Sequence, residues 1–154
     1  MIFDSPIGAL AIYFNDSAVC ELNFLHPPDD EQPEETPAAA RVTAQLQAYF
    51  SSSVRPFSFP VLLRGTDFQR RVWHALQQIP AGEVRTYGQL AEQLHSSARA
   101  VGNACRQNPV PLVVPCHRVV SARGIGGFAG RTEGAEIRIK RWLLKHEGVT
   151  FPHE

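Results

Sequence analysis

The sequence lacks the features of a membrane protein and of a disulfide-stapled one. No stretch approaches the roughly 18 uninterrupted apolar residues of a membrane span, and the N-terminus, MIFDSPIGAL, has neither the basic nor the apolar segment of a secretory signal. Only three cysteines occur in 154 residues, without CxxC spacing, which argues against a disulfide framework and a zinc ribbon. We therefore expect a cytoplasmic protein with free thiols, no membrane contact and no bound metal.

Net charge is also absent, because 15 basic residues balance 15 acidic ones. The balance hides two unequal parts. Residues 1–60 hold eight acidic and two basic residues, whereas residues 61–154 hold thirteen basic and seven acidic ones. Such an asymmetry indicates that the basic part contacts nucleic acid. The alternative is that two oppositely charged parts simply fold against each other.

The N-terminal part predicts a small α+β unit. Residues 11–24 read as a β-hairpin around a turn at 15–17. Thr36 has the form of an N-cap for a helix over residues 37–53. The alternating apolar residues of 57–61 predict a strand, and the proline within it places that strand at a sheet edge.

The C-terminal part predicts a mainly helical unit. Thr66 and Thr86 each open a capping box, and Ser97 caps a further helix. The two short helices on either side of residues 95–96 resemble a helix-turn-helix. The outward face of the second one has two cations, small residues and no carboxylate: Arg99, Gly102, Asn103 and Arg106. We therefore predict an α+β fold with two domains, 1–62 and 63–154.

Residues 108–120, NPVPLVVPCHRVV, carry the strongest signal for chemistry. Three prolines prevent a helix, and the valines make the segment apolar, so it should be extended and buried. Its middle is Cys116-His117-Arg118, and a cation beside a thiol lowers the thiol's pKa and favours the nucleophilic thiolate. The alternative is a buried structural cysteine followed by a surface histidine.

The neighbours of His117 follow from geometry. Adjacent side chains of an extended strand point to opposite faces, so a water molecule is the expected link between Cys116 and His117. The other ring nitrogen needs a partner to fix the tautomer, and Glu147 is the best placed carboxylate. It ends a helix that Gly148 terminates and whose predicted inward residues are Ile139, Trp142, Leu143 and His146. The alternative for Glu147 is a solvated helix end.

The string Pro115-Cys116-His117-Arg118-Val119 resembles the active-site motif of the O6-alkylguanine-DNA alkyltransferases. Segments that match the same family in order and spacing are RAVG at 99–102, NPVP at 108–111, GGFAG at 126–130 and WLLKHEG at 142–148, together with Tyr87. The resemblance runs from about Asp67 to Gly148.

The resemblance implies a ribonuclease H-like N-terminal unit and a monomer that repairs double-stranded DNA without a cofactor. Such proteins flip O6-alkylguanine, and also O4-alkylthymine, out of the duplex. Cys116 would then take the alkyl group once, with His117 as water-mediated base and Glu147 orienting it. Asn108 would brace the active-site turn, and Tyr87 would donate a proton to the departing guanine.

The resemblance also assigns the binding residues. Arg99 would fill the gap left by the flipped base, with its helix in the minor groove. The expected DNA contacts are Thr86, Tyr87, Ala98, Arg99, Ala100, Gly102 and Arg106, and the expected pocket residues are Val119, Gly127, Phe128 and Ala129. The carbonyls of Cys116 and Val119 would read the base's amino edge.

Three departures from the family pattern affect these expectations. The connection at 131–137 is longer than is common, which changes the pocket rim, and Phe128 stands where a tyrosine is often found. Some members carry zinc in the N-terminal domain, but with only Cys20 and His26 in that part we predict none here.

Two other functions compete with alkyl transfer. The same helix pair could serve a non-enzymatic DNA-damage sensor or transcription factor, whose function would survive replacement of Cys116 by serine. A Cys-His-Glu hydrolase is the third hypothesis, and it ranks last because the sequence has no recognisable oxyanion-hole motif.

Overall fold

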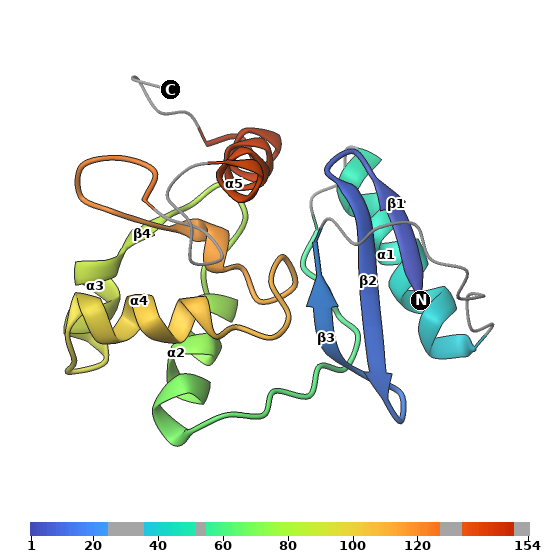
Figure 1. Ribbon diagram of the computed structural model, residues 1–154, viewed down its shortest axis with the longest axis horizontal. Helices are drawn as coiled ribbons and strands as arrows, with labels where there is room; N and C mark the ends of the chain where they lie inside the picture. The colour runs from blue at the N-terminus through green and yellow to red at the C-terminus, as the bar shows by residue number, and fades with distance from the viewer. Residues whose placement is uncertain (25–35, 52–54, 127–133, 150–154) are drawn as a thin grey trace. The chain divides into compact units, whose positions relative to one another are not determined.

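A computed structural model describes residues 1–24, 36–51, 55–126 and 134–149 (Figure 1). The chain divides into two compact units, Met1–Arg64 and Gly65–Glu154. In the part of the chain that the structure describes, no helix is both long enough and apolar enough to cross a membrane.

The first unit is built on a three-stranded antiparallel sheet of order β1-β2-β3, with β1 at Ile2–Ser5, β2 at Gly8–Asn15 and β3 at Ala18–Asn23. The predicted hairpin is confirmed as β2 and β3. Strand β1 was not predicted, because four residues that begin with two adjacent apolar side chains show no alternation.

Helix α1 covers Pro37–Ser51 and lies against one face of this sheet (Figure 1). Thr36 caps it as predicted, since its Oγ1 accepts a hydrogen bond of 3.0 Å from the backbone N–H of Ala39. The rings of Phe3 on β1 and Phe50 on α1 stack with centroids 6.0 Å apart. The helix therefore buries one apolar face on the sheet.

The strand predicted at 57–61 is reduced to a single bridge between Val61 and Val19. Two backbone hydrogen bonds hold it, from the N–H of Val19 to the carbonyl of Pro60 and from the N–H of Leu62 to the carbonyl of Val19. Pro60 has no N–H to donate, which limits how far the ladder extends in this segment.

The second unit holds α2 (Asp67–Gln77), β4 (Arg85–Thr86), α3 (Tyr87–Gln93), α4 (Ala98–Arg106), the short 3-10 helix η1 (Cys116–Arg118), β5 (Val119–Val120) and α5 (Ala135–His146). Both predicted capping boxes are complete. Thr66 and Gln69 cap α2, and Thr86 and Gln89 cap α3, each by reciprocal side-chain to backbone hydrogen bonds.

Helices α3 and α4 form the predicted helix-turn-helix. His95, in the tight link, takes a left-handed conformation with φ 54°. Val101 and Ala104 of α4 are buried, and the indole Nε1 of Trp73 on α2 donates a 2.8 Å hydrogen bond to the carbonyl of Ala104. This buried bond ties α2 to the inner face of α4.

The inward face of α5 differs from the prediction. Ile139 and Leu143 are buried as expected, but Trp142 and His146 lie partly exposed, with their rings stacked at 4.8 Å. Lys140 is fully buried in their place. The face was misjudged because a lysine in an amphipathic pattern indicates the solvent side, and here it does not.

Candidate active site

A short parallel pairing of β4 with β5 brings the start of α3 beside the Cys-His-Arg segment, because Arg85 pairs with Val119 and Thr86 with Val120. The extended backbone predicted for this segment is wrong at its centre, where Cys116–Arg118 form η1. The N–H of Val119 closes this turn on the carbonyl of Cys116. The three prolines all precede η1, so they leave its N–H donors intact.

Asn108 holds the loop in front of Cys116. Its Nδ2 donates a 2.8 Å hydrogen bond to the carbonyl of Val114, and its Oδ1 accepts a 3.0 Å bond from the N–H of Val110. The loop passes through a left-handed residue, Leu112, with φ 74°. The side chain thus closes the turn from both ends, which fixes the position of the backbone that carries Cys116.

The Cys116 thiol is buried, with only 6% of the residue exposed. Burial raises its pKa, and the hydrogen bond from Asn108 and the positive charge of Lys140 act in the opposite direction. The net shift is upward. A thiol with a raised pKa is protonated at neutral pH, so it needs a proton acceptor before it can act as a nucleophile.

His117 and Glu147 supply a buried acid–base pair. His117 Nε2 lies 2.8 Å from Glu147 Oε2, and both side chains are fully buried. Burial lowers the pKa of His117 despite the neighbouring carboxylate, so the neutral imidazole is favoured at pH 7. Burial alone would raise the pKa of Glu147, but the hydrogen bonds from His117 and Arg118 hold it well below its usual range.

One nitrogen of the imidazole remains open. His117 Nδ1 is buried and has no hydrogen-bond partner among the residues the structure describes. With Nε2 engaged by the Glu147 carboxylate, the neutral tautomer that donates to Glu147 carries its lone pair on Nδ1. The ring is therefore arranged to accept a proton on the side away from Glu147.

Arg118 completes this network and does not serve the thiol. Its Nε donates to Glu147 Oε1 at 2.8 Å, its Nη2 to Glu147 Oε2 at 2.9 Å, and its Nη1 to the carbonyl of Ile79 at 2.6 Å. The sequence indicated Arg118 as the cation beside Cys116, and in the structure this guanidinium forms a two-point contact with the carboxylate. Lys140 is the cation whose charge acts on Cys116.

Stability should depend on pH through His117. Below its ordinary pKa of 6.5 the unfolded chain binds a proton that the folded state disfavours, so the free energy of unfolding falls as pH drops from about 7 to about 5. Glu147, whose pKa is lowered in the folded state, adds a separate loss only below its ordinary 4.5. Urea unfolding at several pH values should show a flatter profile for His117→Asn between pH 7 and 5. An unchanged slope would contradict this assignment.

Lys140 is a site residue that the sequence reasoning missed. It is 0% exposed, and its Nζ donates a 2.7 Å hydrogen bond to the carbonyl of Val119. Burial lowers its pKa to about 8, and negative charge on Cys116 or Cys105 acts in the opposite direction. The sequence offered one signal for its burial. Lys140 lies three residues after Ile137 and four before Leu144, so it shares a helix face with these two buried residues.

Tyr87, the first residue of α3, lies close to Gly126. A Cβ on Gly126 would be 3.3 Å from Tyr87 Cε2 and 3.1 Å from the N of Ser121, and φ is +77°, so only glycine fits here without strain. Burial raises the pKa of Tyr87, which keeps its hydroxyl protonated. The expected pocket residues Gly127, Phe128 and Ala129 lie outside the described residues, as do residues 131–133 of the 131–137 connection.

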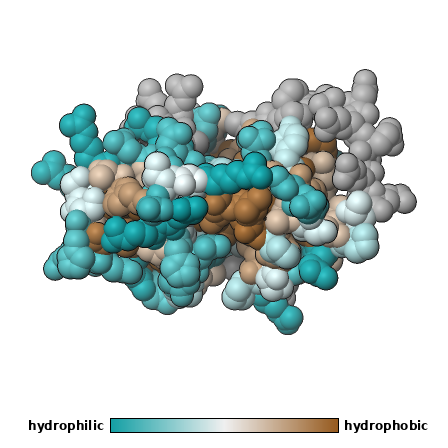
Figure 2. Space-filling model, turned by 90° about the horizontal axis from the view of Figure 1, so that it is seen from below, coloured by the Kyte–Doolittle hydropathy of each residue, from teal (hydrophilic) through white to brown (hydrophobic). Residues whose placement is uncertain are grey.

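The outer face of α4 matches the predicted face. Ala98, Arg99, Asn103 and Arg106 are exposed, and Ala100 and Gly102 are half-buried. A Cβ on Gly102 would meet nothing within 4 Å, so the backbone is open to close approach there. On the face shown in Figure 2, hydrophilic residues surround smaller hydrophobic areas.

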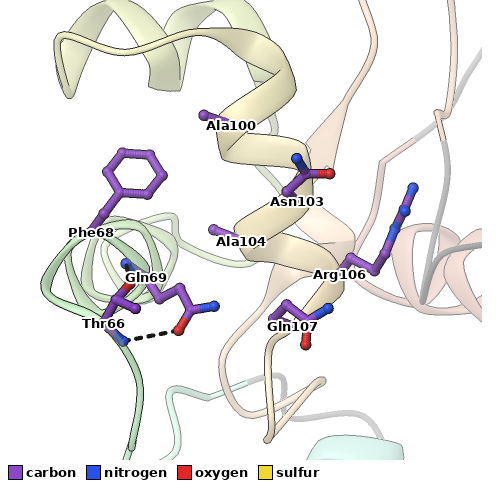
Figure 3. A pocket seen from close by; sticks show the side chains of 8 residues that line it. All are labelled: Thr66, Phe68, Gln69, Ala100, Asn103, Ala104, Arg106 and Gln107. Carbon is purple, nitrogen blue, oxygen red and sulfur yellow. Dashed lines mark hydrogen bonds between the residues drawn. The ribbon is translucent and has the colours of Figure 1, made fainter.

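A pocket of about 350 Å³ lies between the start of α2 and α4 (Figure 3). It is lined by Thr66, Phe68, Gln69, Ala100, Asn103, Ala104, Arg106 and Gln107. Gln69 turns back to cap Thr66, and Arg106 points away from α2 (Figure 3). The lining does not include Cys116, so this hollow belongs to the α4 surface and not to the thiol site.

Across the residues that the structure places, no group of three or more His, Cys, Asp or Glu side chains could hold a metal ion. Cys20 is half-buried on β3, and His26 lies in the undescribed segment 25–35.

The sequence matches two family models in tandem. The ribonuclease-like domain of 6-O-methylguanine DNA methyltransferase matches residues 1–63, and the DNA-binding domain of the same name matches residues 67–149. The methylated-DNA–protein-cysteine methyltransferase of Methanosarcina acetivorans is 37% identical over 155 residues, covering 96% of each chain. The protein of that name from Mycobacterium bovis is 41% identical over 156 residues, covering 97% of this chain and 92% of its own.

A solved structure agrees with these matches. Mycobacterium tuberculosis OGT in complex with DNA is 40% identical, with a TM-score of 0.79, and covers 95% of this chain and 90% of its own. The chain that holds the buried thiol, its histidine–carboxylate pair and the helix-turn-helix thus matches a class of proteins with a ribonuclease-like domain and a DNA-binding domain. The chain belongs to the 6-O-methylguanine DNA methyltransferase family.

Proposed function

We propose that the protein repairs DNA by moving the alkyl group of O6-alkylguanine, and of O4-alkylthymine, onto its own Cys116. The activity is that of a methylated-DNA–protein-cysteine methyltransferase, in line with its relatives. The observation that carries the proposal is the buried Cys116 beside a buried His117–Glu147 pair whose Nδ1 is unbonded. A thiol in that setting can lose its proton only to a neighbouring base.

The transfer begins when Cys116 loses its proton. A water molecule passes the Cys116 proton to His117 Nδ1, and the thiolate attacks the alkyl carbon. A carbon–sulfur bond forms, the carbon–O6 bond breaks, and its electron pair stays with guanine. The Tyr87 hydroxyl, which burial keeps protonated until then, donates the proton that guanine needs, and the proton held on His117 returns through solvent to the Tyr87 oxygen, so that only Cys116 and guanine are changed. Asn108 holds the turn throughout.

The product sets the stoichiometry. An S-alkylcysteine is a thioether, which water does not cleave readily, so each protein should act once. Titrating a fixed amount of protein with an O6-methylguanine oligonucleotide should give repair that stops at one equivalent. Repair well beyond one equivalent would contradict the thioether product and would favour a hydrolytic reaction.

Duplex DNA is the proposed partner, with α4 in the minor groove and a monomer as the active species. The DNA complex of the mycobacterial relative supports DNA binding by this chain. The exposed Arg99 would occupy the place of the flipped base, and the open backbone at Gly102 suits close approach to the groove. Thr86, Ala98, Ala100 and Arg106 would complete the contact, and Val119 would line the base pocket with the undescribed residues 127–129.

The domain boundary belongs to the same proposal. We place it between residues 62 and 63, with a structural domain before it and the DNA-binding and transfer domain after it. The two family models, over 1–63 and 67–149, support this division, and the thiol network lies within the second domain.

Arg99→Ala separates base flipping from chemistry. We expect repair of duplex substrate to fall by about tenfold to a hundredfold. Unstacking and unpairing the target base costs a few kcal/mol, and in the variant no inserted side chain offsets that cost. Transfer from free O6-alkylguanine base should stay near the wild-type rate. Arg138→Ala is the matched control, since Arg138 is an exposed arginine on α5. Equal losses on duplex and free base would refute the inserted role of Arg99.

A further inference from the structure

Lys140 has a place in the site that the proposed mechanism does not use. Its side chain is fully buried on α5, although a lysine is almost never fully buried without a reason. Its Nζ donates to the carbonyl of Val119 at 2.7 Å, and the N–H of the same Val119 donates to the carbonyl of Cys116. The ammonium group is therefore linked to the backbone of the nucleophile through one residue.

Lys140 and Tyr87 also share a neighbour, Gly126. The point where a Cβ of Gly126 would stand is 3.6 Å from Lys140 Nζ and 3.3 Å from Tyr87 Cε2. The phenol ring and the ammonium group therefore both lie next to Gly126. The two side chains reach this point from different helices, α3 and α5.

The titratable groups around the thiol come from several elements. Lys140 lies on α5, Cys105 on α4 and Tyr87 on α3, while His117 follows Cys116 on η1. Arg118 neutralises Glu147 through two hydrogen bonds. This leaves Lys140 as the cation whose charge lowers the pKa of Cys116, and the Cys116 thiolate in turn raises the pKa of Lys140.

We propose that Lys140 is a positioning residue for the transfer reaction: its buried ammonium group is the counter-charge of the Cys116 thiolate and fixes the Val119 carbonyl. The inference rests on the proposed function, because that transfer needs a thiolate at Cys116. The Cys116 proton still leaves to His117, and Lys140 keeps its own proton while the thiolate exists. Burying a cation costs stability. An apolar residue of the same shape would fill the same space without that cost, so packing alone does not account for a lysine here.

The test uses a neutral probe that needs no DNA. Iodoacetamide alkylates a thiolate with loss of iodide, and peptide mass spectrometry separates the adduct at Cys116 from those at Cys20 and Cys105. The rate at Cys116 is measured from about pH 6 to about pH 9. Lys140→Met should lower it about tenfold at pH 7 and move the inflection to higher pH, because the counter-charge is gone.

Two further variants separate charge from contact. Lys140→Gln keeps a donor for the Val119 carbonyl but carries no charge, so it should behave like Lys140→Met, whereas Lys140→Arg should restore most of the rate. Lys145→Met is the matched control, because Lys145 is exposed on the same helix. A wild-type pH profile in both neutral variants would overturn the proposal. A wild-type profile in Lys140→Gln alone would assign the effect to the contact and also overturn it.

A further measurement uses the wild-type protein, so its result does not depend on whether the variants fold. Lysine labelled with ¹³C reports the pKa of Lys140 by NMR before and after iodoacetamide caps Cys116. Capping removes the thiolate, so the pKa of Lys140 should fall, and an unchanged value would contradict the pairing. Failure of the wild type to accept an alkyl group from O6-methylguanine DNA would refute the proposed function and would leave these two measurements interpretable.

Discussion

Replacing Cys116 by serine is expected to abolish alkyl transfer while leaving duplex binding within about twofold of the wild type. A serine hydroxyl has nearly the same size but gives almost no anion at neutral pH, so the nucleophile is lost. Transfer should fall by at least about 10⁴-fold, the scale on which loss of a nucleophile acts. Binding should survive because Cys116 is buried and the exposed cations of α4 are unchanged. Methyl transfer and duplex affinity are measured on the same preparation.

The control for this variant is Cys20→Ser. Cys20 is a half-buried thiol on β3 of the first unit, and its Sγ lies 3.6 Å from the carbonyl of Tyr13. Transfer should be unchanged in that variant. If Cys116→Ser retained its cellular function, the damage-sensor alternative would be correct and the transferase account would fail.

Glu147→Gln is expected to lose both stability and rate. The change leaves the Arg118 guanidinium, only 12% exposed, without its carboxylate partner. Breaking one partner of a buried ion pair costs about 3–5 kcal/mol of unfolding free energy. An amide also orients His117 poorly as a base, so transfer should fall by about 10²–10³-fold. Urea unfolding and single-turnover transfer at pH 7 measure the two effects.

Glu83→Gln is the matched control for that prediction. Glu83 pairs with Arg85 at 3.3 Å on the surface, where the Arg85 side chain is 38% exposed and the Glu83 side chain 54%. Such a pair contributes less than about 1 kcal/mol, so neither stability nor rate should change much. A similar loss in the two variants would contradict the special role assigned to the buried network. Full transfer activity in a folded Glu147→Gln protein would exclude Glu147 as the group that orients His117.

Local signals in the sequence were sufficient for much of the fold. Thr66, Thr86 and Ser97 cap helices as predicted because capping depends on side chains within three residues. The turn at Asp16 and the N-cap at Thr36 are local for the same reason. Glu147 was found because helix C-termination at Gly148 placed it at a defined point, and the structure brings it to His117.

The remaining features depend on contacts between distant segments. The burial of Lys140 requires the Val119 carbonyl, which lies 21 residues away in sequence. Arg118 was assigned to the thiol because it is adjacent in sequence, but its guanidinium reaches Glu147, 29 residues away. Periodicity records only the polarity of each side chain and cannot show that a polar side chain has a buried partner.

Only part of the basic excess in the C-terminal part is available for contact with DNA. The excess of basic residues after residue 60 includes every cation assigned to DNA, but Arg118 and Lys140 are used inside the protein. Few cations therefore remain for phosphate contacts on α4. The dependence of duplex affinity on salt concentration should be shallow, since each phosphate contact contributes a slope of about one.

The most direct test of the central claim is the intact mass of the protein before and after incubation with an O6-methylguanine oligonucleotide. The account predicts a gain of one CH₂ unit per protein, with the modified peptide containing Cys116 and the oligonucleotide restored to guanine. No mass gain, or a methyl group located on Cys20 or Cys105, would contradict it.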